Sequence, residues 1–403
     1  MEVTAETATA AKECRVAILT QGLFKNYGGI LQNFALQRIL ERGGLVPYTV
    51  KVPKLPPFRD DPVWRKAVKL GSDILGKILR RNKTIRPWNS KKKVYDTING
   101  SINFLSEKTH VFVRKNIRQT VAVSFPSGLD VLKKYHFHAY LVGSDQVWRP
   151  KFSPWQPAYF LDFAEEENVV RASYAASFGT DKMEMSGEDI AHYKPLLQKF
   201  DLVSVREASG VDLCRDYFAV AAEQVLDPTL LLDAADYEKT IPEEMIRKER
   251  FVFSYILDDR PKKKRFAEAL AERMNARSCR ILLPNPAVGT CVPSRIAPYV
   301  EDWLRNIRDA ETIVTDSFHG AVFAILFRKN FWIFDNPGRG SSRIASLLEM
   351  LGLKDRLISK LDELPKDMPA IEYDAVFSRI TKMRQKSMSF LTAFVDKCKG
   401  QLK

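Results

Sequence analysis

The chain has 403 residues, 45% hydrophobic and 28% charged, an ordinary composition for a globular protein and long enough for two domains. No window of about 18 residues is continuously apolar, which argues against a membrane-spanning helix. The formal net charge is +14, and residues 51–118 alone hold 18 Lys and Arg against 5 Asp and Glu. This segment predicts an anionic partner, such as lipid head groups, a lipid-linked pyrophosphate or nucleic acid.

The N-terminus and the cysteines bear on the cellular compartment. Residues 1–14 lack the basic start and the apolar stretch of a signal peptide, so we expect a flexible tail there. The five cysteines are scattered and none forms a C-x-x-C pair. That pattern favours a reducing compartment over a disulfide framework or a zinc knuckle. We therefore expect a cytoplasmic protein without a metal site.

The first 50 residues predict a strand, a loop, a helix and a second strand. Short apolar runs occupy residues 15–20 and 45–50, and apolar side chains recur at helical spacing over 30–42. Glycines in the first turn allow a ligand to approach the backbone closely, although a tight turn without a ligand explains them equally well. The pattern is not G-x-G-x-x-G, so it predicts no dinucleotide cofactor. The candidate cleft residues of this turn are Asn26, Tyr27, Gly28 and Gly29.

Residues 52–120 interrupt this alternation with a basic helical insertion. Over residues 63–80, apolar side chains repeat on one helical face and Lys or Arg on the other. The pattern is typical of an amphipathic helix that lies on an anionic membrane. It also fits a helix packed on its own domain with a solvated basic face. The first interpretation places the protein at the inner face of the plasma membrane. Residues 95–117 predict a further helix.

Alternating strands and helices resume after the insertion. Expected strands cover residues 139–143, 172–178, 202–205, 224–226, 251–257, 280–284, 313–314 and 330–334. Expected helices cover residues 192–199, 209–217, 262–274, 298–310, 343–348 and 373–399, with one more that opens at His319. This order predicts an N-terminal Rossmann-like domain over 15–235 and a C-terminal one over 236–371. The helix over 372–403 is expected to cross back to the first domain.

Polar side chains follow two of these strands. Asp145, Gln146 and Trp148 come after the strand at 139–143 and combine polar groups with an aromatic platform, which suits sugar recognition. Capping of a helix is the alternative for the first two. His319 follows the strand at 313–314 and opens an apolar helix, where ligands bind in open α/β sheets. The unpaired N–H groups of that helix favour an anion, and His319 is the candidate acid or base.

Six motifs, in order along the chain, resemble the polysaccharide pyruvyl transferase family. They are N-Y-G-G-I-L-Q-N-F-A-L (26–36), G-S-D-Q-V-W (143–148), S-V-R-E-x-S-G (204–210), V-L-D-P-T (225–229), T-D-S-F-H-G-A-V-F (315–323) and S-S-R-I-x-S-L-L (341–348). The resemblance implies a GT-B-like fold, in which two Rossmann-like domains face a cleft. It also implies transfer of pyruvate from phosphoenolpyruvate to sugar hydroxyls as a ketal, in exopolysaccharide, capsule or other cell-surface glycan biosynthesis. Residues 52–120 lie outside the recognisable pattern.

Phosphoenolpyruvate carries a phosphate and a carboxylate, and arginine grips either group with two hydrogen bonds. The residues expected to bind it are Arg206, Arg339, Arg343, Ser317 and Gly320. His319 is expected to supply and recover the proton, and to face Arg206 across the cleft. The acceptor, a glycan expected to be lipid-linked, would approach from the turn at 26–29 and from the segment 145–148. Phosphoenolpyruvate is a donor substrate, so no cofactor is expected.

Two other functions remain open on the sequence. A glycosyltransferase of the same fold would use a nucleotide sugar instead of phosphoenolpyruvate. A non-enzymatic protein would use residues 52–120 as a nucleic-acid or membrane surface, with Trp64, Trp88 and Phe104 among its basic residues. The enzyme interpretation expects no nucleic acid, while contact with an anionic membrane is compatible with it.

Overall fold

The computed structural model describes residues 13–52, 106–123, 128–153, 156–164, 168–244, 249–258, 260–281, 296–358, 364, 367 and 369–402. The tail expected over residues 1–14 lies outside this part of the chain except for its last two residues. The expected membrane-binding helix at 63–80 lies outside it entirely.

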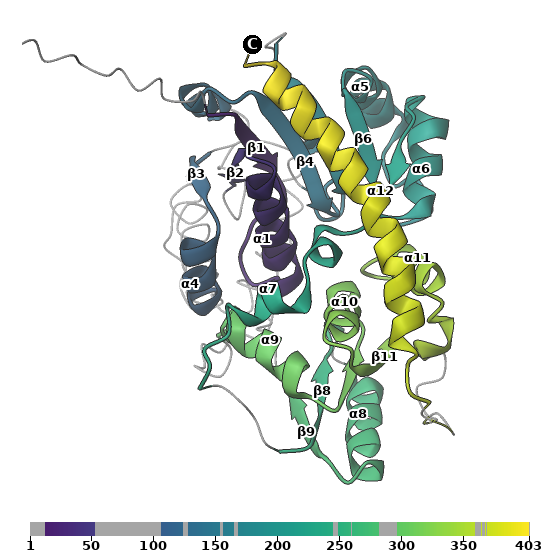
Figure 1. The fold of residues 1–403 in the computed structure, drawn as a ribbon. Helices are drawn as coiled ribbons and strands as arrows, with labels where there is room; N and C mark the ends of the chain where they lie inside the picture. Colours follow the sequence, from purple (N-terminus) through teal and green to yellow (C-terminus); the bar gives the residue numbers. More distant parts are fainter. Residues whose placement is uncertain are drawn as a thin grey trace, which may run out of the picture.

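A seven-stranded parallel sheet forms the first half of the molecule (Figure 1). Its strand order is β3-β2-β1-β4-β5-β6-β7, and every strand pair is parallel. The order reverses between β1 and β4, which creates the crevice where open α/β sheets bind ligands. The strands are β1 (Arg15–Leu19), β2 (Val46–Lys51), β3 (Gln119–Ala122), β4 (Ala139–Asp145), β5 (Val170–Ala176), β6 (Leu202–Val205) and β7 (Glu223–Gln224).

A five-stranded parallel sheet forms the second half. Its order is β12-β11-β10-β8-β9, with β10 at the centre. The strands are β8 (Phe251–Tyr255), β9 (Arg277–Arg280), β10 (Thr312–Thr315), β11 (Asn330–Phe334) and β12 (Leu357–Ile358). The central strands are buried along their length, as expected of a sheet covered on both faces.

Helices cover both sheets. They are α1 (Tyr27–Arg42), α4 (Glu107–Asn116), α5 (Gly187–Leu197), α6 (Ala208–Leu213), α7 (Ala234–Glu238), α8 (Pro261–Arg273), α9 (Val300–Asp309), α10 (Phe318–Leu326), α11 (Ser341–Leu351) and α12 (Tyr373–Gly400). Short 3-10 segments include η1 (Leu129–Tyr135), η2 (Gln156–Phe160), η4 (Pro228–Leu231) and η6 (Lys354–Arg356), and η3 (Cys214–Phe218) is a π-helical turn. No helix among the described residues is both long and apolar enough to cross a membrane.

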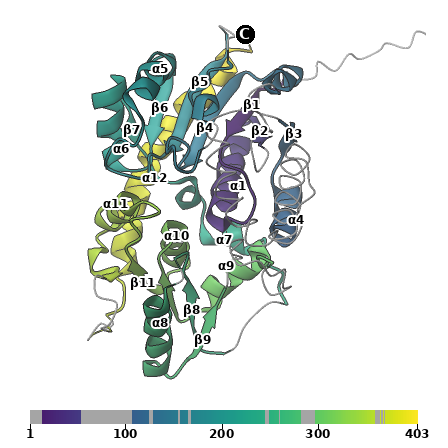
Figure 2. The same ribbon diagram turned by 180° about the vertical axis from the view of Figure 1, so that it is seen from behind.

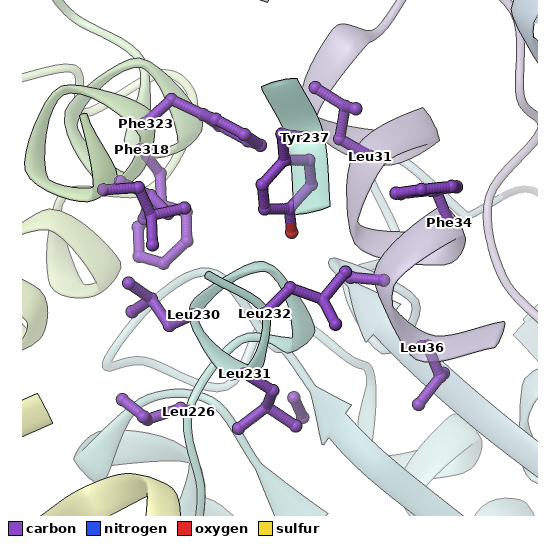
Figure 3. Close-up of a cluster of buried hydrophobic side chains, with 14 of the residues drawn as sticks. Leu31, Phe34, Leu36, Leu226, Leu230, Leu231, Leu232, Tyr237, Phe318 and Phe323 are labelled. Carbon is purple, nitrogen blue, oxygen red and sulfur yellow. The ribbon is translucent and has the colours of Figure 1, made fainter. Parts of the chain in front are cut away.

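One hydrophobic cluster joins the two halves (Figure 3). The segment η4–α7 lies between α1 of the first half and α10 of the second. Tyr237 on α7 packs against Phe34 of α1 at 6.0 Å and against Phe323 of α10 at 4.8 Å between ring centroids. Because these side chains are almost fully excluded from water, the relative position of α1 and α10 is fixed by core packing.

Helix α12 spans both halves (Figures 1 and 2). Its start is tied to the second half, where the Tyr373 hydroxyl donates to the Lys329 carbonyl at 2.5 Å. Further along, the Leu226 amide donates to Ser387 Oγ at 2.9 Å, and the ring of Phe390 lies 6.1 Å from that of Tyr174 on β5. Its apolar residues recur at helical spacing, which lets a single face pack along both sheets.

The expected fold class is confirmed, with two parallel, Rossmann-like sheets and helices on their faces. Several elements differ from the sequence expectation, among them α7 and β12, which it did not include. The strand expected at residues 280–284 is β9 at 277–280, an edge strand whose side chains are mostly exposed, so it lacks an apolar pattern. Strand β3 was not expected, because its short sequence Q-T-V-A is buried at only one residue.

Candidate active site

A cavity of about 90 Å³ lies where the carboxyl ends of the two sheets face each other. Loops after β1 and β4 form one wall of it, and loops after β8, β10 and β11 form the other. The first wall consists of Gln21, Asn26, Asp145, Gln146 and Phe152. The second wall consists of Leu257, Asp316, Ser317, Phe318, His319, Asn336, Arg339, Gly340, Arg343 and Ile344.

His319 enters this cavity from the first turn of α10. Ser317 is the N-cap of the helix, and its Oγ accepts a hydrogen bond from the Gly320 amide at 3.3 Å. The imidazole is 5% exposed, and its Nε2 lies 3.5 Å from Oδ2 of Asp227. A carboxylate in this position orients a histidine.

Gly28 of α1 also lies against His319. A Cβ atom at this position would lie 2.0 Å from Nδ1 of the imidazole. Only glycine therefore allows α1 and α10 to approach this closely. The imidazole is thus held between Asp227 at its Nε2 side and the α1 backbone at its Nδ1 side.

The two carboxylate oxygens of Asp227 have different hydrogen-bond partners. Its Oδ1 accepts hydrogen bonds from the amide and the hydroxyl of Thr229, at 3.0 and 2.6 Å, which shapes the turn into η4. Its Oδ2 accepts from Arg206 Nη1 at 2.6 Å and from Ser144 Oγ at 3.2 Å. Burial alone would raise the pKa of Asp227, but His319 and Arg206 outweigh it and hold the pKa well below its usual range.

Arg206 lies in the network behind the cavity. Its Nη2 contacts Asp145 Oδ1 at 3.3 Å, so its guanidinium bridges two buried carboxylates. The side chain is 2% exposed and does not line the cavity. Arg206 and His319 share the partner Asp227, but they do not face each other across the cavity as expected, because Arg206 lies behind its wall. The expected direct contact of Arg206 with a donor does not fit this apo arrangement, because both of its terminal nitrogens already face carboxylates.

Arg343 and Arg339 do line the cavity. Arg343 lies in α11 and is 7% exposed; its Nη1 is 3.6 Å from Asp145 Oδ1, and its buried Nε has no hydrogen-bond partner among the described residues. Burial and the neighbouring Arg206 lower the pKa of Arg343. Arg339 is exposed, and its guanidinium has no hydrogen-bond or ion-pair partner in the described part of the chain. An anion in the cavity would supply the negative charge that is needed to balance both guanidinium groups.

Backbone geometry allows the loops of the two halves to approach each other closely beside the cavity. Gly340, at the N-cap of α11, has φ 107°, and a Cβ there would lie 2.2 Å from the Gly179 carbonyl oxygen of the first half. Asp145 also has positive φ, at 78°, and a side chain that accepts from Asn26 Nδ2 at 3.2 Å and from the Gln146 amide at 2.9 Å. Strained backbone at such a position is typical of functional sites.

Several predicted contact residues lie elsewhere. Trp148 is fully buried, donates from Nε1 to the Tyr159 carbonyl and stacks on Phe160, so the expected aromatic platform is wrong for this residue. Tyr27 is buried against Trp303 with its ring 5.4 Å away. Gly29 and Gly320 do not line the cavity. At Gly320 a Cβ would lie 2.3 Å from Thr315 Oγ1, so its role is close packing and its amide serves the helix cap.

Sequence reasoning missed two features of the site, the roles of Asp227 and Phe152. Asp227 stands in the V-L-D-P-T motif, but its place directly after a strand end was not used as a signal for the site. Asp316 binds the Lys263 ammonium at 2.6 Å and Asn336 Nδ2 at 3.0 Å, which fixes the loop after β11 to that after β10. Phe152 gave no signal, because it lies in an irregular loop. The described residues contain no cluster of three or more His, Cys, Asp or Glu that would hold a metal ion.

Two parallel sheets with a polar cavity at their facing carboxyl ends define an α/β protein of the two-domain, ligand-binding type. A family model described as polysaccharide pyruvyl transferase matches residues 26–338. The chain belongs to the polysaccharide pyruvyl transferase family, and the resemblance seen in its motifs is confirmed. Membership makes the chain a transferase of polysaccharide biosynthesis with a glycan as acceptor.

Solved structures resemble the chain at low sequence identity. The Arabidopsis thaliana protein UGT89C1 complexed with UDP-L-rhamnose has 10% identity and a TM-score of 0.46, over 96% of this chain and 99% of that chain. A putative UDP-N-acetylglucosamine 2-epimerase from Listeria monocytogenes has 10% identity and a TM-score of 0.43, over 94% and 98%. The glycotransferase of kitacinnamycin has 11% identity and a TM-score of 0.44, over 98% and 100%. No curated protein sequence matches the chain significantly.

Proposed function

We propose that the chain transfers the pyruvyl group of phosphoenolpyruvate to two hydroxyls of a sugar, which forms a cyclic ketal and releases phosphate. One observation carries the proposal: His319, paired with Asp227 behind it, and the under-compensated Arg343 line one cavity at the facing strand ends. An acid or base next to an anion-binding group is what this reaction requires.

The donor would lie against Arg343 and Arg339. A buried guanidinium is costly when its charge is incompletely balanced, and the lowered pKa of Arg343 expresses that cost. A phosphate or carboxylate would balance it with two parallel hydrogen bonds. Ser317, at the cavity wall, adds a hydroxyl for the same anion. Arg206 would act indirectly, by holding Asp145 and Asp227 in their charged forms.

His319 would transfer the protons. Protonation of the methylene carbon converts the donor's C=CH2 group into a methyl group next to an oxocarbenium-like carbon. One sugar hydroxyl adds to that carbon and loses its proton to the imidazole. The second hydroxyl then displaces phosphate, which leaves with the proton of that hydroxyl, so one diol and one phosphoenolpyruvate give one ketal and one phosphate. Asp227 would stabilise the protonated imidazole between these steps.

The acceptor is proposed to be a lipid-linked oligosaccharide at the inner face of the plasma membrane. The charge of residues 51–118 supports this placement, since anionic head groups attract such a segment. Charge reversal of Lys66, Lys69 and Lys77 would test it by vesicle co-sedimentation. Unchanged binding to vesicles of anionic phospholipid would exclude the membrane contact while leaving the reaction untouched.

The reaction is tested by incubation with phosphoenolpyruvate and a panel of lipid-linked glycans. We expect phosphate release that depends on the glycan and a product heavier by one ketal-linked pyruvyl group. A parallel incubation with UDP- and GDP-sugars tests the glycosyltransferase alternative. Release of UDP or GDP, with no phosphate from phosphoenolpyruvate, would replace the proposal by that alternative. Salt-sensitive RNA binding without turnover of either donor would favour the non-enzymatic one.

A further inference from the structure

We infer that the cavity wall formed by Gln21, Gln146 and Phe152 is the subsite for the acceptor sugar, with the Phe152 ring as its stacking platform. The inference rests on the proposed function and adds to it where the sugar binds. It replaces Trp148, which the sequence favoured as the aromatic platform but which lies in the core.

The charges of the two cavity walls favour this division. The wall of the second half carries Arg339, Arg343 and His319. None of the first-half residues that line the cavity is a cation, and their one anion, Asp145, is already paired with Arg206. Two cations lie beside the Phe152 ring, and both have partners: Arg149 is paired with Glu184 at 2.8 Å, and Lys151, 5.6 Å from the ring centroid, donates to the Gly338 carbonyl. A doubly anionic donor therefore belongs on the second wall. The first wall is left for a neutral ligand that is rich in hydroxyls.

The two glutamines present one acceptor and one donor to such a ligand. Gln21 Nε2 donates to the Gln146 carbonyl at 2.9 Å, while its Oε1 has no partner among the described residues. Gln146 Oε1 accepts from Arg149 Nη1 at 3.0 Å, while its Nε2 has none in the same part of the chain. Each amide is thus fixed through one atom and offers the other. Sugar hydroxyls both donate and accept, so they match this pair.

Phe152 supplies the apolar surface beside these amides. The ring is half-buried and lines the cavity, and the Arg149 guanidinium lies 5.1 Å from its centroid. Its backbone is held by the same network, because its amide donates to the Arg149 carbonyl at 3.0 Å and its carbonyl accepts from Gln21 Nε2 at 3.4 Å. A pyranose has a C–H face and a rim of hydroxyls. An aromatic ring flanked by fixed amides complements both.

The neighbouring residue connects this platform to the donor wall. Lys151 Nζ donates to the Gly338 carbonyl at 3.1 Å, one residue before Arg339. The loop that carries Phe152 is therefore fastened to the loop that carries a donor-binding arginine. This contact links the two proposed subsites, whose relative position the reaction requires.

The test compares Phe152→Ala, Phe152→Tyr and a matched control. Phe377 is a partly buried phenylalanine of α12 that also lies beside an arginine, with Arg328 at 4.7 Å, but it is outside the cavity. The probes are para-nitrophenyl hexopyranosides, followed by saturation-transfer NMR, and phosphoenolpyruvate, followed by calorimetry. We expect Phe152→Ala to weaken hexoside binding about tenfold. Phe152→Tyr and Phe377→Ala should bind the hexoside like the wild type, and phosphoenolpyruvate affinity should stay within about twofold in all three.

The outcomes separate this inference from the proposed function. Unchanged hexoside binding by Phe152→Ala would overturn the inference, as would wild-type protein that binds none of the hexosides. A loss confined to phosphoenolpyruvate, or to UDP added in a third titration, would assign the ring to the donor and also overturn it. Hexoside binding that depends on Phe152, together with no phosphoenolpyruvate binding by the wild type, would support the sugar subsite and refute the proposed donor.

Discussion

Arg206 and Arg343 both contact Asp145, one from the first half of the molecule and one from the second. Arg206 bridges two buried carboxylates at 2.6 and 3.3 Å. Arg343 reaches only one carboxylate, at 3.6 Å, while the Nε of each arginine is buried without a partner among the described residues. Their pKa values move in opposite directions: burial lowers both, but Asp227 and Asp145 more than compensate at Arg206 and not at Arg343.

The difference separates a structural charge from a ligand-binding charge. A buried ion pair contributes little net stability, yet removal of one partner is strongly destabilising. Arg206 therefore belongs to the scaffold that holds Asp227 charged beside His319. Arg343 lacks that compensation and is available to an anion. The sequence assigned both arginines to the donor and did not distinguish them.

The largest effect is expected at the proton-transferring group. His319→Asn should lower kcat for phosphate release by about 10² to 10⁴, since general acid–base catalysis contributes that much. Phosphoenolpyruvate affinity, set by the arginines, should change little. Steady-state kinetics and calorimetry measure the two quantities. His192→Asn, an exposed histidine of α5, is the matched control, and equal kcat in both variants would contradict the assignment.

Replacement of the two arginines tests the comparison directly. Arg206→Leu should lower the free energy of unfolding by about 3–5 kcal/mol, because Asp227 and Asp145 lose their shared cation. Arg343→Leu should change it by less than about 1 kcal/mol and instead weaken phosphoenolpyruvate binding by about tenfold or more. Urea denaturation measures the free energy of unfolding, and calorimetry measures the binding of phosphoenolpyruvate. Comparable losses of stability in both variants would contradict the distinction between a structural Arg206 and a ligand-binding Arg343.

Gly28→Ala should displace the imidazole without removing it. The new methyl group would lie 2.0 Å from Nδ1 of His319, so the ring must move. Misplacement of a reacting group by about 1 Å costs about a hundredfold in rate. Gly187→Ala, where a Cβ meets no atom within 4 Å, is the control for the substitution itself. Wild-type turnover by Gly28→Ala would place the reacting group elsewhere.

The smallest effect is a dependence of stability on pH. The pKa values of Asp145 and Asp227 are lowered in the folded protein, by neighbouring cations that outweigh their burial. Their contribution is fully present above the unfolded value of about 3.9 and is lost as pH falls below it. Each carboxylate then adds a slope of up to about 1.4 kcal/mol per pH unit. Chemical denaturation between neutral and acidic pH should show a flatter profile for Asp227→Asn, but not for the exposed Asp374→Asn on α12.

The sequence was sufficient where local pattern decides the structure. The strand, polar turn and apolar helix around His319 identified β10, α10 and the histidine at their junction, because parallel strands expose their carboxyl ends to ligands. The same reasoning identified Asp145 and Arg343. These residues lie at element ends, and the ends of parallel strands meet in space.

The sequence was insufficient where a residue far away in the chain determines the partner or the burial of a side chain. Asp145 and Arg206 are 61 positions apart, and no local pattern predicts that they form an ion pair. Trp148 and Phe152 are both aromatic residues after the same strand. Only the packing of Trp148 against Phe160 and Phe178 shows which of them is buried. Chemical type was therefore predictable at this wall, whereas the direction of each side chain was not.

Helix α12 has a consequence for how far the two halves can move relative to each other. The chain passes between the halves first through the segment after β7 and then again through α12 (Figure 1). Two bodies joined at one point can swivel in any direction, but a second connection removes much of that freedom. The second passage therefore acts with the packing of Tyr237 between α1 and α10 to restrain the two halves. The alignment of His319 with Phe152 would then be preorganised by the fold.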